Sequence, residues 1–289
     1  MRILTLTTLL SAIFIISCTE QQPDQVQQEP LLTDPGVVSY TFRNQFSEDV
    51  PGTLDIIKEM GFTKIEFSSL FGKTANELRE LLDERGLVCT SYGVGYNTLV
   101  DNIEQVIEEA QTLGAEYVRV ASIPHDRDRV FSIDDMRKAV ADFNEAGRIL
   151  SANGLRFNYH NHGYEFLPYG DGTLFDYMVE NTDPAYVNFE MDVYWVAHPG
   201  HDPVELLIRY PDRINQVHLK DLSKNATHDF TGSAPSHYDV PLGTGQIDFP
   251  AFLRAAQNSN IEHYYIEDET EDVVNRVPRS FEYITGITN

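Results

Sequence analysis

The stretch TLDIIKEMGFTKIEF, residues 53–67, holds an amphipathic helical segment, a glycine and an apolar strand-like segment in direct succession. Gly61 follows the helical part, where glycine ends a helix in the left-handed conformation without steric penalty. The same arrangement returns at Gly86, Gly114 and Gly154, each shortly before another strand-like run. Repeated units of this kind predict crossover connections and therefore a parallel sheet.

Working outward from this stretch, we find eight strand-like runs. They are VVSYTF at 37, TKIEF at 63, LVCTS at 87, EYVRVA at 116, RFNYHNH at 156, YVNFEMD at 186, INQVHLK at 214 and HYYIED at 263. The segments between them are helical in pattern: TLDIIKEM, TANELRELLDER, LVDNIEQVIEEAQTL, IDDMRKAVADFNEAGRILSAN, LFDYMVEN, DPVELLIRY and FPAFLRAAQN, with VPRSFEYIT closing the chain. Eight such units in about 250 residues predict a single (β/α)8 TIM barrel. A doubly wound open sheet is the alternative, but no glycine-rich phosphate loop follows the first strand.

The N-terminal segment MRILTLTTLLSAIFIISC has one basic residue, Arg2, followed by a short apolar run. This pattern is typical of a signal peptide, and its IISC ending resembles a bacterial lipobox. We expect a lipoprotein signal peptide over residues 1–17, lipid on Cys18, a flexible Gln/Pro-rich tether over 18–36 and a catalytic domain over 37–289. An ordinary signal peptide with a chance cysteine is the alternative. The protein would then be exported and lipid-anchored, on the periplasmic or cell-surface side of a bacterial membrane.

The charge of the chain excludes several partners. There are 21 Lys and Arg residues against 45 Asp and Glu residues, a net charge of −24. A nucleic-acid binder needs basic side chains to displace counterions, so DNA and RNA are not expected as partners. An anionic membrane surface would also repel the domain, which leaves the lipid as the membrane contact. If Cys18 carries lipid, Cys89 is alone, no intrachain disulfide forms, and Cys89 is expected to be a small core residue.

Polar side chains gather at the C-terminal ends of the strand-like runs, where the active site of a (β/α)8 barrel lies. In YVNFEMD they alternate with an apolar face and end at Asp192. The polar residues at the other strand ends are Glu66, His160, His162, His218, Lys220 and Glu267. Buried charges are costly unless they are paired or bind metal, so one divalent cation would satisfy this set. The alternative for a single strand-end acid is a helix cap; here Asp202 is the expected cap, because a loop is predicted after Asp192.

The stretch NYHNHGYEF, residues 158–166, places His160 and His162 on one strand face and aromatic residues on the other. The remaining histidines receive other interpretations. His198 and His201 are expected at the surface, and His228 and His237 in a long loop, residues 222–247, over the barrel mouth. The aromatic residues just past Asp192 either stack on a sugar or pack under that loop; they are Tyr194 and Trp195.

Four motifs, MDVYWV, VHLKD, PLGTGQIDFPAFL and YYIEDE, resemble the xylose isomerase-like barrels of the sugar phosphate isomerase/epimerase type. This superfamily includes ketose 3-epimerases, inosose dehydratases and AP endonucleases such as endonuclease IV. The resemblance runs from about Val37 to the end of the chain. YHNHGYEF and the lipobox resemble the exported lipoprotein branch of sugar-degrading Bacteroidetes.

The resemblance implies one divalent metal, usually Mn²⁺ with Zn²⁺ or Mg²⁺ as alternatives, held by Glu, Asp, His and Glu from strands five to eight. The matching residues here are Asp192, His218 and Glu267. His160 stands where ketose epimerases have the strand-five glutamate, which puts their two-glutamate mechanism in doubt. Glu165, a turn further on, is expected to supply the missing carboxylate as fourth ligand. The alternative is that His160 or His162 binds the metal, or that both bind substrate hydroxyls.

The expected reaction is removal of a carbon-bound proton next to the carbonyl of a sugar or keto-sugar, as in an isomerase or epimerase. Glu267 is the expected base and Lys220 the stabiliser of negative oxygen, with His162 as acid and Glu165 as a further catalytic group. The residues expected to contact substrate are His160, Glu66, Trp195 and Tyr194. The alternatives are a lyase or hydratase acting on a 3-keto-glycoside or an inosose, a nuclease, which the charge opposes, and a non-catalytic glycan-binding lipoprotein.

Overall fold

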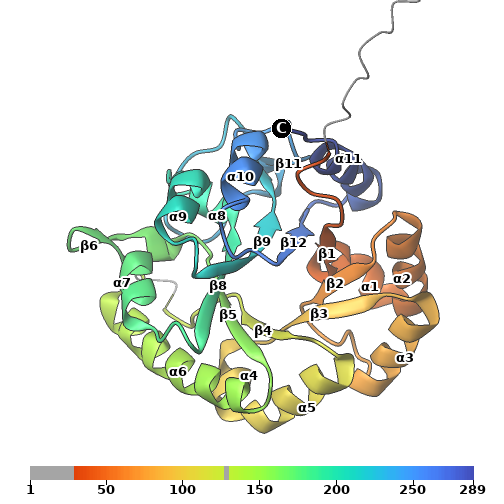
Figure 1. The fold of residues 1–289 in the computed structure, drawn as a ribbon, viewed down its shortest axis with the longest axis horizontal. Helices are drawn as coiled ribbons and strands as arrows, with labels where there is room; N and C mark the ends of the chain where they lie inside the picture. Colours follow the sequence, from red (N-terminus) through yellow and green to blue (C-terminus); the bar gives the residue numbers. More distant parts are fainter. Residues whose placement is uncertain (1–28, 127–129) are drawn as a thin grey trace, which may run out of the picture.

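The structure, a computed structural model, describes residues 29–126 and 130–289, in which eight parallel strands close a barrel (Figure 1). The strand order around the barrel is β1-β12-β9-β8-β5-β4-β3-β2. The strands are β1 Gly36–Val38, β2 Lys64–Phe67, β3 Val88–Gly93, β4 Tyr117–Val120, β5 Arg156–His160, β8 Val187–Asp192, β9 Ile214–Leu219 and β12 His263–Ile266. The predicted single (β/α)8 barrel is confirmed, and the closed order excludes the open-sheet alternative.

Helices surround the barrel and are joined to it by short loops and two small antiparallel ribbons. The helices are α1 Arg43–Glu48, α2 Val50–Glu59, α3 Ala75–Arg85, α4 Tyr96–Asp101, α5 Ile103–Leu113, α6 Ile133–Ala152, α7 Leu174–Asn181, α8 Val193–Ala197, α9 Pro203–Arg209, α10 Phe249–Ala256 and α11 Val273–Thr285. The ribbons are β6 Pro168–Tyr169 with β7 Gly172–Thr173, and β10 Asp221–Leu222 with β11 Asp239–Val240. Single turns of 3-10 helix lie at η1 Ser39–Phe42, η2 Tyr164–Phe166 and η3 Ser236–Tyr238.

Two elements differ from their predicted form. The run VVSYTF is a strand only as far as Val38 and continues as the 3-10 turn η1. The helix predicted over LVDNIEQVIEEAQTL is two helices, α4 and α5, which meet at Asn102. Asn102 has φ −136° and ψ 38°, outside the helical region. The apolar pattern of the sequence therefore continues through Asn102, whereas the helix is interrupted there.

The glycines that follow the helical segments have the predicted backbone conformation. The φ angles are 95° at Gly61, 64° at Gly86, 76° at Gly114 and 77° at Gly154. A side chain is strained in this region, so these four positions stop each helix and release the chain into the next strand.

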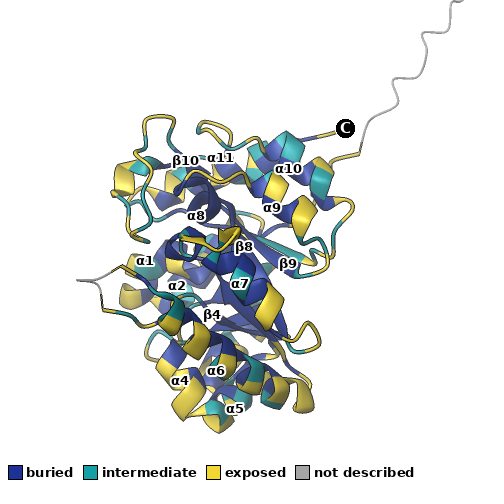
Figure 2. Ribbon diagram, turned by 90° about the vertical axis from the view of Figure 1, so that its left-hand side faces the viewer, coloured by how far each residue is buried: buried dark blue, intermediate teal, exposed yellow. Residues whose placement is uncertain are grey.

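The helices bury one side against the barrel, and Figure 2 shows the strands enclosed by buried helix faces while the outer faces are exposed. Phe157 and Tyr159 of β5 lie against Phe143 of α6, with ring centroids 5.0 and 5.2 Å apart. Phe189 of β8 meets Phe175 of α7 at 5.2 Å. The apolar faces of β5 and β8 therefore point outward as predicted, which leaves their polar residues inside the barrel.

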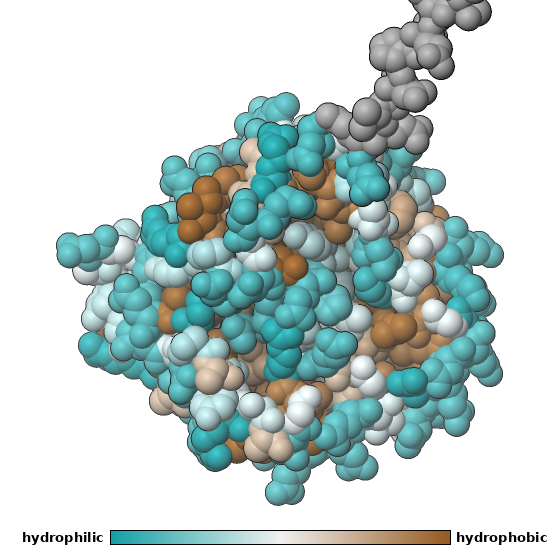
Figure 3. Space-filling model, in the orientation of Figure 1, coloured by the Kyte–Doolittle hydropathy of each residue, from teal (hydrophilic) through white to brown (hydrophobic). Residues whose placement is uncertain are grey.

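Part of the predicted tether packs on the barrel. The Leu31 N–H donates to the carbonyl of Ile287 at 2.8 Å, and Leu32 is buried. The folded domain therefore begins near residue 30 rather than at 37, whereas the signal peptide and Cys18 lie outside the described residues. Among the described residues no helix has the length and hydropathy needed to cross a membrane. The face in Figure 3 is mostly hydrophilic, with separate apolar patches.

Candidate metal centre at the mouth of the barrel

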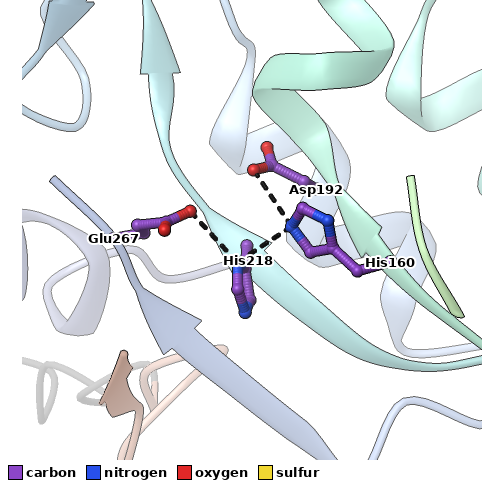
Figure 4. Close-up of side chains that lie close together, drawn as sticks. All are labelled: His160, Asp192, His218 and Glu267. Atoms are coloured by element: carbon purple, nitrogen blue, oxygen red, sulfur yellow. Dashed lines mark hydrogen bonds and ion pairs between the residues drawn. The ribbon is translucent and has the colours of Figure 1, made fainter. Parts of the chain in front are cut away.

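Four buried side chains converge at the C-terminal ends of four neighbouring strands (Figure 4). They are His160 at the end of β5, Asp192 at the end of β8, His218 in β9 and Glu267 directly after β12. Their candidate ligand atoms lie within 4.8 Å of one another. His160 Nε2 is 3.2 Å from His218 Nδ1 and 3.4 Å from Asp192 Oδ2. His218 Nδ1 is 3.1 Å from Glu267 Oε2.

The atoms of this cluster fit a divalent cation. Asp192 Oδ2 is buried and, among the described residues, has no hydrogen-bond donor, although its other oxygen caps α8. Burial raises the pKa of Asp192 to about 6, because the charges of Lys220 and His218 only partly offset the loss of solvation of this carboxylate. Burial likewise holds the pKa of His160 well below its usual range, which keeps the imidazole neutral and its nitrogen lone pair free. Two imidazoles and two carboxylates are a ligand set that Mn²⁺ and Zn²⁺ accept.

The far side of His218 is fixed by two more carboxylates. His218 Nε2 lies 2.9 Å from Glu66 Oε1 and 3.2 Å from Glu190 Oε2. Because ionised carboxylates only accept hydrogen bonds, Nε2 carries a hydrogen and Nδ1 is directed toward the cluster. Burial alone would lower the pKa of His218, but the charges of Glu190, Glu66 and Glu267 outweigh it and raise the pKa well above its usual value. A divalent cation would therefore bind at Nδ1 in exchange for a proton.

Arg119 of β4 balances these inner carboxylates. Its Nη2 donates to Glu66 Oε1 at 2.5 Å, and its Nε lies 3.3 Å from Glu190 Oε2. A side chain on Gly93 would place its Cβ 2.9 Å from the guanidinium carbon, so the glycine makes room for Arg119. Burial, aided by the charge of Glu66, raises the pKa of Glu190 to about 7. Glu66, predicted to contact substrate, belongs to this network beneath the cluster.

Lys220 completes the charge balance on the other side of the cluster. It is buried, contacts the carboxylate of Glu269, and has its Nζ 3.9 Å from Glu267 Oε2. Burial would lower the pKa of Lys220, but Glu267, Glu269 and Asp239 outweigh burial and raise it well above its usual value. The ammonium ion therefore lies beside Glu267, as expected for a group that stabilises negative oxygen.

A cavity of about 310 Å³ opens above the cluster. Its lining includes His160, His218 and Glu267 on one side and Trp195 with His162 on another. The His162 ring stacks on Trp195, with centroids 4.8 Å apart and an interplanar angle of 22°. Trp195 and His162 thus line the cavity, and their contact with a substrate stays a prediction.

Three side chains lie elsewhere than we expected. Glu165 lies outside the cluster, where it accepts hydrogen bonds from the hydroxyl of Tyr159 and from the His162 N–H at 3.0 Å. His160 is the cluster residue from the end of β5 instead. Tyr194 does not line the cavity, because it is buried under Lys220, whose Nζ lies 4.9 Å from the ring centroid. His198, expected at the surface, is buried and stacks on Tyr194.

The expected loop after Asp192 is also absent. Helix α8 begins at the next residue, and Asp192 Oδ1 accepts from the backbone N–H groups of Tyr194 and Trp195. Asp192 is therefore a helix cap through one oxygen and a candidate ligand through the other. Asp202 caps α9, as expected.

Sequence reasoning missed Arg119 and Glu269. The available signal for Arg119 was its place in EYVRVA, where a charged residue alternates with apolar ones on a strand whose inner face must be filled. Glu269 is the last residue of the motif YYIEDE, but it lies beyond the strand end and had no comparable signal. His228 and His237 lie outside both histidine-containing clusters at the mouth. Cys89 is a buried free thiol, as predicted.

Comparison with known proteins gives consistent results. The family model described as xylose isomerase-like TIM barrel matches residues 54–286. An inosose dehydratase of Geobacillus kaustophilus is 26% identical over 268 residues, covering 79% of this chain and 85% of the relative. The crystal structure of a sugar phosphate isomerase/epimerase from Parabacteroides distasonis has a TM-score of 0.73 at 22% identity, covering 92% and 99% of the two chains. The structure of the IolI protein with a bound zinc atom has a TM-score of 0.67 at 15% identity, covering 87% and 95%.

Proposed function

This chain belongs to the xylose isomerase-like TIM barrel family, and we propose that it is a sugar-modifying enzyme that removes a carbon-bound proton next to a carbonyl. The observation that carries the proposal is the buried convergence of His160, Asp192, His218 and Glu267 beneath an open cavity. The inosose dehydratase and the sugar phosphate isomerase/epimerase support a sugar or keto-sugar as substrate. A non-catalytic glycan-binding protein would need no such buried ligand set.

One divalent ion held by these four residues is part of the proposal. Such an ion would polarise a substrate carbonyl and neutralise the charge that develops on its oxygen. Mixed carboxylate and imidazole ligands suit Mn²⁺, and the zinc-bound IolI structure supports Zn²⁺ as the first alternative, before Mg²⁺.

Glu267 is the proposed base. Burial alone would raise its pKa, but the positive charges of Lys220 and His218 outweigh burial and hold the pKa well below its usual range. The carboxylate is therefore ionised at neutral pH and can accept a proton from carbon. Lys220, charged and 3.9 Å away, is placed to stabilise negative oxygen.

His162 suits a different role from the predicted acid. Its Nδ1 lies 3.1 Å from the carbonyl oxygen of Ala121 and so carries the hydrogen, which leaves Nε2 as an acceptor. Burial, together with the nearby His160, lowers the pKa of His162 to about 4, so the ring is neutral at physiological pH. We propose that His162 accepts a hydrogen bond from a substrate hydroxyl.

Elimination is the second candidate outcome. With His160 in place of a glutamate, the cluster formed by the described residues contains one glutamate, Glu267, which lies 3.9 Å from Lys220 Nζ. Epimerisation by two opposed carboxylates lacks its second partner in this arrangement, whereas removal of a proton followed by loss of a β-substituent needs one base. The inosose dehydratase relative supports this outcome.

The proposal is tested by following substrate C–H signals by NMR in D₂O with Mn²⁺ and a series of ketoses and keto-glycosides. We expect enzyme-dependent uptake of deuterium next to the carbonyl, with a new epimer if the enzyme is an epimerase or an unsaturated product if it eliminates. Glu267→Gln should lower the exchange rate at least about a hundredfold while the fold persists. The proposal is wrong if no substrate exchanges while Asp192→Asn still binds glycans as tightly as the wild type.

A further inference from the structure

A second cavity adjoins the one above the ligand cluster. Its volume is about 670 Å³, and His162 and Ser122 line both cavities. Among the described residues that line the second cavity, none is an Asp, Glu, Lys or Arg. The first cavity, by contrast, is lined by Arg119, Glu267 and Glu269. The two cavities thus share part of their lining, but their described lining residues differ in charge.

The residues between the two cavities are fixed by contacts on both sides. The His162 ring is fixed by the Ala121 carbonyl and stacks on Trp195 in the first cavity. On the other side, the hydroxyl of Tyr164 accepts the Ile123 N–H at 2.8 Å, which pins the chain after β4. A substrate could therefore extend past His162 without displacing the backbone on either side.

The second cavity is lined by aromatic side chains. The rings of His125, Phe131 and Tyr164 pack together, with centroids 4.7 to 5.1 Å apart. Phe230 comes from the long loop after β10, and Gly232 brings that loop against the wall. A Cβ on Gly232 would lie 2.7 Å from the Tyr164 ring and 3.0 Å from the His162 carbonyl oxygen, so this close approach requires glycine.

We propose that the second cavity binds a neutral, ring-containing substituent of the substrate, whose keto-sugar ring lies over Glu267 in the first cavity. This inference rests on the proposed function and adds the substrate class: a keto-glycoside with a ring-bearing aglycone rather than a free keto-sugar. Aromatic side chains beside hydroxyl and imidazole groups suit the flat face and the polar edge of an aromatic or sugar ring.

The test compares methyl, phenyl and glucosyl 3-keto-glucosides as substrates in the deuterium-exchange assay. We expect kcat/KM to be roughly tenfold or more higher for a ring-bearing substrate than for the methyl compound, because the ring buries its face in the cavity. A larger advantage for phenyl identifies an aromatic aglycone, and a larger one for glucosyl a second sugar. Phe230→Ala should reduce the advantage to about threefold or less. Ile208→Ala, exposed on α9, is the control and should leave the advantage unchanged.

Equal kcat/KM for the three substrates, or an equal loss on all three in Phe230→Ala, would overturn the inference while leaving the proposed function intact. If no substrate exchanges deuterium, measured ligand affinities test the second cavity independently of the reaction. Trp195 is the single tryptophan of the chain and lies at the shared wall, so its fluorescence reports on ligands there. Phenyl or glucosyl glucoside should bind roughly tenfold more tightly than methyl glucoside, and Phe230→Ala should remove the difference. Equal affinities would reject the second site.

Discussion

His218 contacts acidic residues through both of its ring nitrogens. Glu66 and Glu190 hold Nε2–H from beneath, so Nδ1 is directed toward the cluster that contains Asp192. Groups that orient a ligand in this way commonly change metal affinity by tenfold to a hundredfold when they are lost. The inner carboxylates would therefore act on a bound metal through His218 without contacting it.

Replacing Glu66 with Gln should weaken metal binding by about tenfold or more, because the amide removes the charge that holds the Nε2 proton. The affinity can be measured by titration of the apoprotein with Mn²⁺ and Zn²⁺. Glu145→Gln is a matched control: Glu145 is exposed on α6 and pairs with Arg148. Equal affinities for Glu66→Gln and Glu145→Gln would show that His218 is not oriented by Glu66.

Glu165 should make stability depend on pH. Burial raises its pKa from 4.5 to about 7, despite hydrogen bonds from Tyr159 and the backbone of His162 that favour the ionised form. The folded state thus holds this proton more tightly than the unfolded state. Its contribution to the free energy of unfolding is complete below pH 4.5 and is lost as the pH rises to about 7, by up to about 3 kcal/mol.

The measurement is urea unfolding of wild type and Glu165→Gln from pH 4 to 8, with a chelator present throughout so that metal binding does not contribute. The variant cannot titrate at this position, so its stability should fall less between pH 4.5 and 7. Parallel pH profiles for the two proteins would mean that Glu165 is ionised in both the folded and the unfolded state.

Two irregular strand pairings bring site residues into register. Between β2 and β3, Ile65 pairs with Cys89 but Glu66 pairs with Ser91, whose hydroxyl donates to Glu66 at 2.6 Å. Between β8 and β9, Phe189 pairs with Ile214 but Glu190 pairs with Gln216, which sets Asp192 beside His218. Each shift has the effect of a β-bulge, and bulges of this kind re-aim side chains near active sites.

These shifts mark the limit of what the sequence could predict. Strand alternation placed Asp192, His218 and Glu267 among several polar residues at strand ends, and the resemblance to the xylose isomerase-like barrels selected these three as ligands. Glu165 was misplaced because Gly163, at φ 100°, turns the chain so that the carboxylate folds back on the His162 N–H. A single left-handed residue decides this contact, and no periodicity signals it.

Helix α6 should not tolerate a methyl group at Gly147. Alanine normally stabilises a helix relative to glycine by about 1 kcal/mol. Here an added Cβ would lie 2.5 Å from the backbone oxygen of Tyr186 and would push α6 away from the chain before β8. Gly147→Ala should therefore destabilise the protein by about 2 kcal/mol or more, as measured by urea unfolding. Ser151→Ala, exposed on the same helix, should change stability by less than about 0.5 kcal/mol, and an equally stable Gly147→Ala would contradict the packing.

The chain as a whole is strongly acidic. At the mouth of the barrel, the buried carboxylates pair with Arg119, Lys220 and His218. Six carboxylates of the described residues approach this region, so a divalent cation would relieve repulsion that these three bases leave in place. The six are Glu66, Glu190, Asp192, Asp239, Glu267 and Glu269. The charge of the molecule thus favours a cation at the mouth and opposes nucleic acid as partner.

We propose that the protein is attached to a membrane through lipid on Cys18, on the evidence of the IISC ending and the polar segment after it. Cys18→Ala should move the protein from the membrane to the soluble fraction of cells, because one lipid-modified residue supplies the anchor. Equal distribution of wild type and Cys18→Ala between the fractions would reject the anchor without affecting the account of the barrel.

The measurement that tests the central claim most directly is the metal content of purified protein, compared with that of Asp192→Asn after reconstitution. The asparagine keeps an oxygen that can cap α8, so the fold should persist, but it removes the charged Oδ2 that faces His160. We predict about one divalent ion per chain in the wild type and a loss of most of it in Asp192→Asn. Wild-type protein that takes up no metal, or an Asp192→Asn protein that retains a full equivalent, would contradict a metal centre at His160, Asp192, His218 and Glu267.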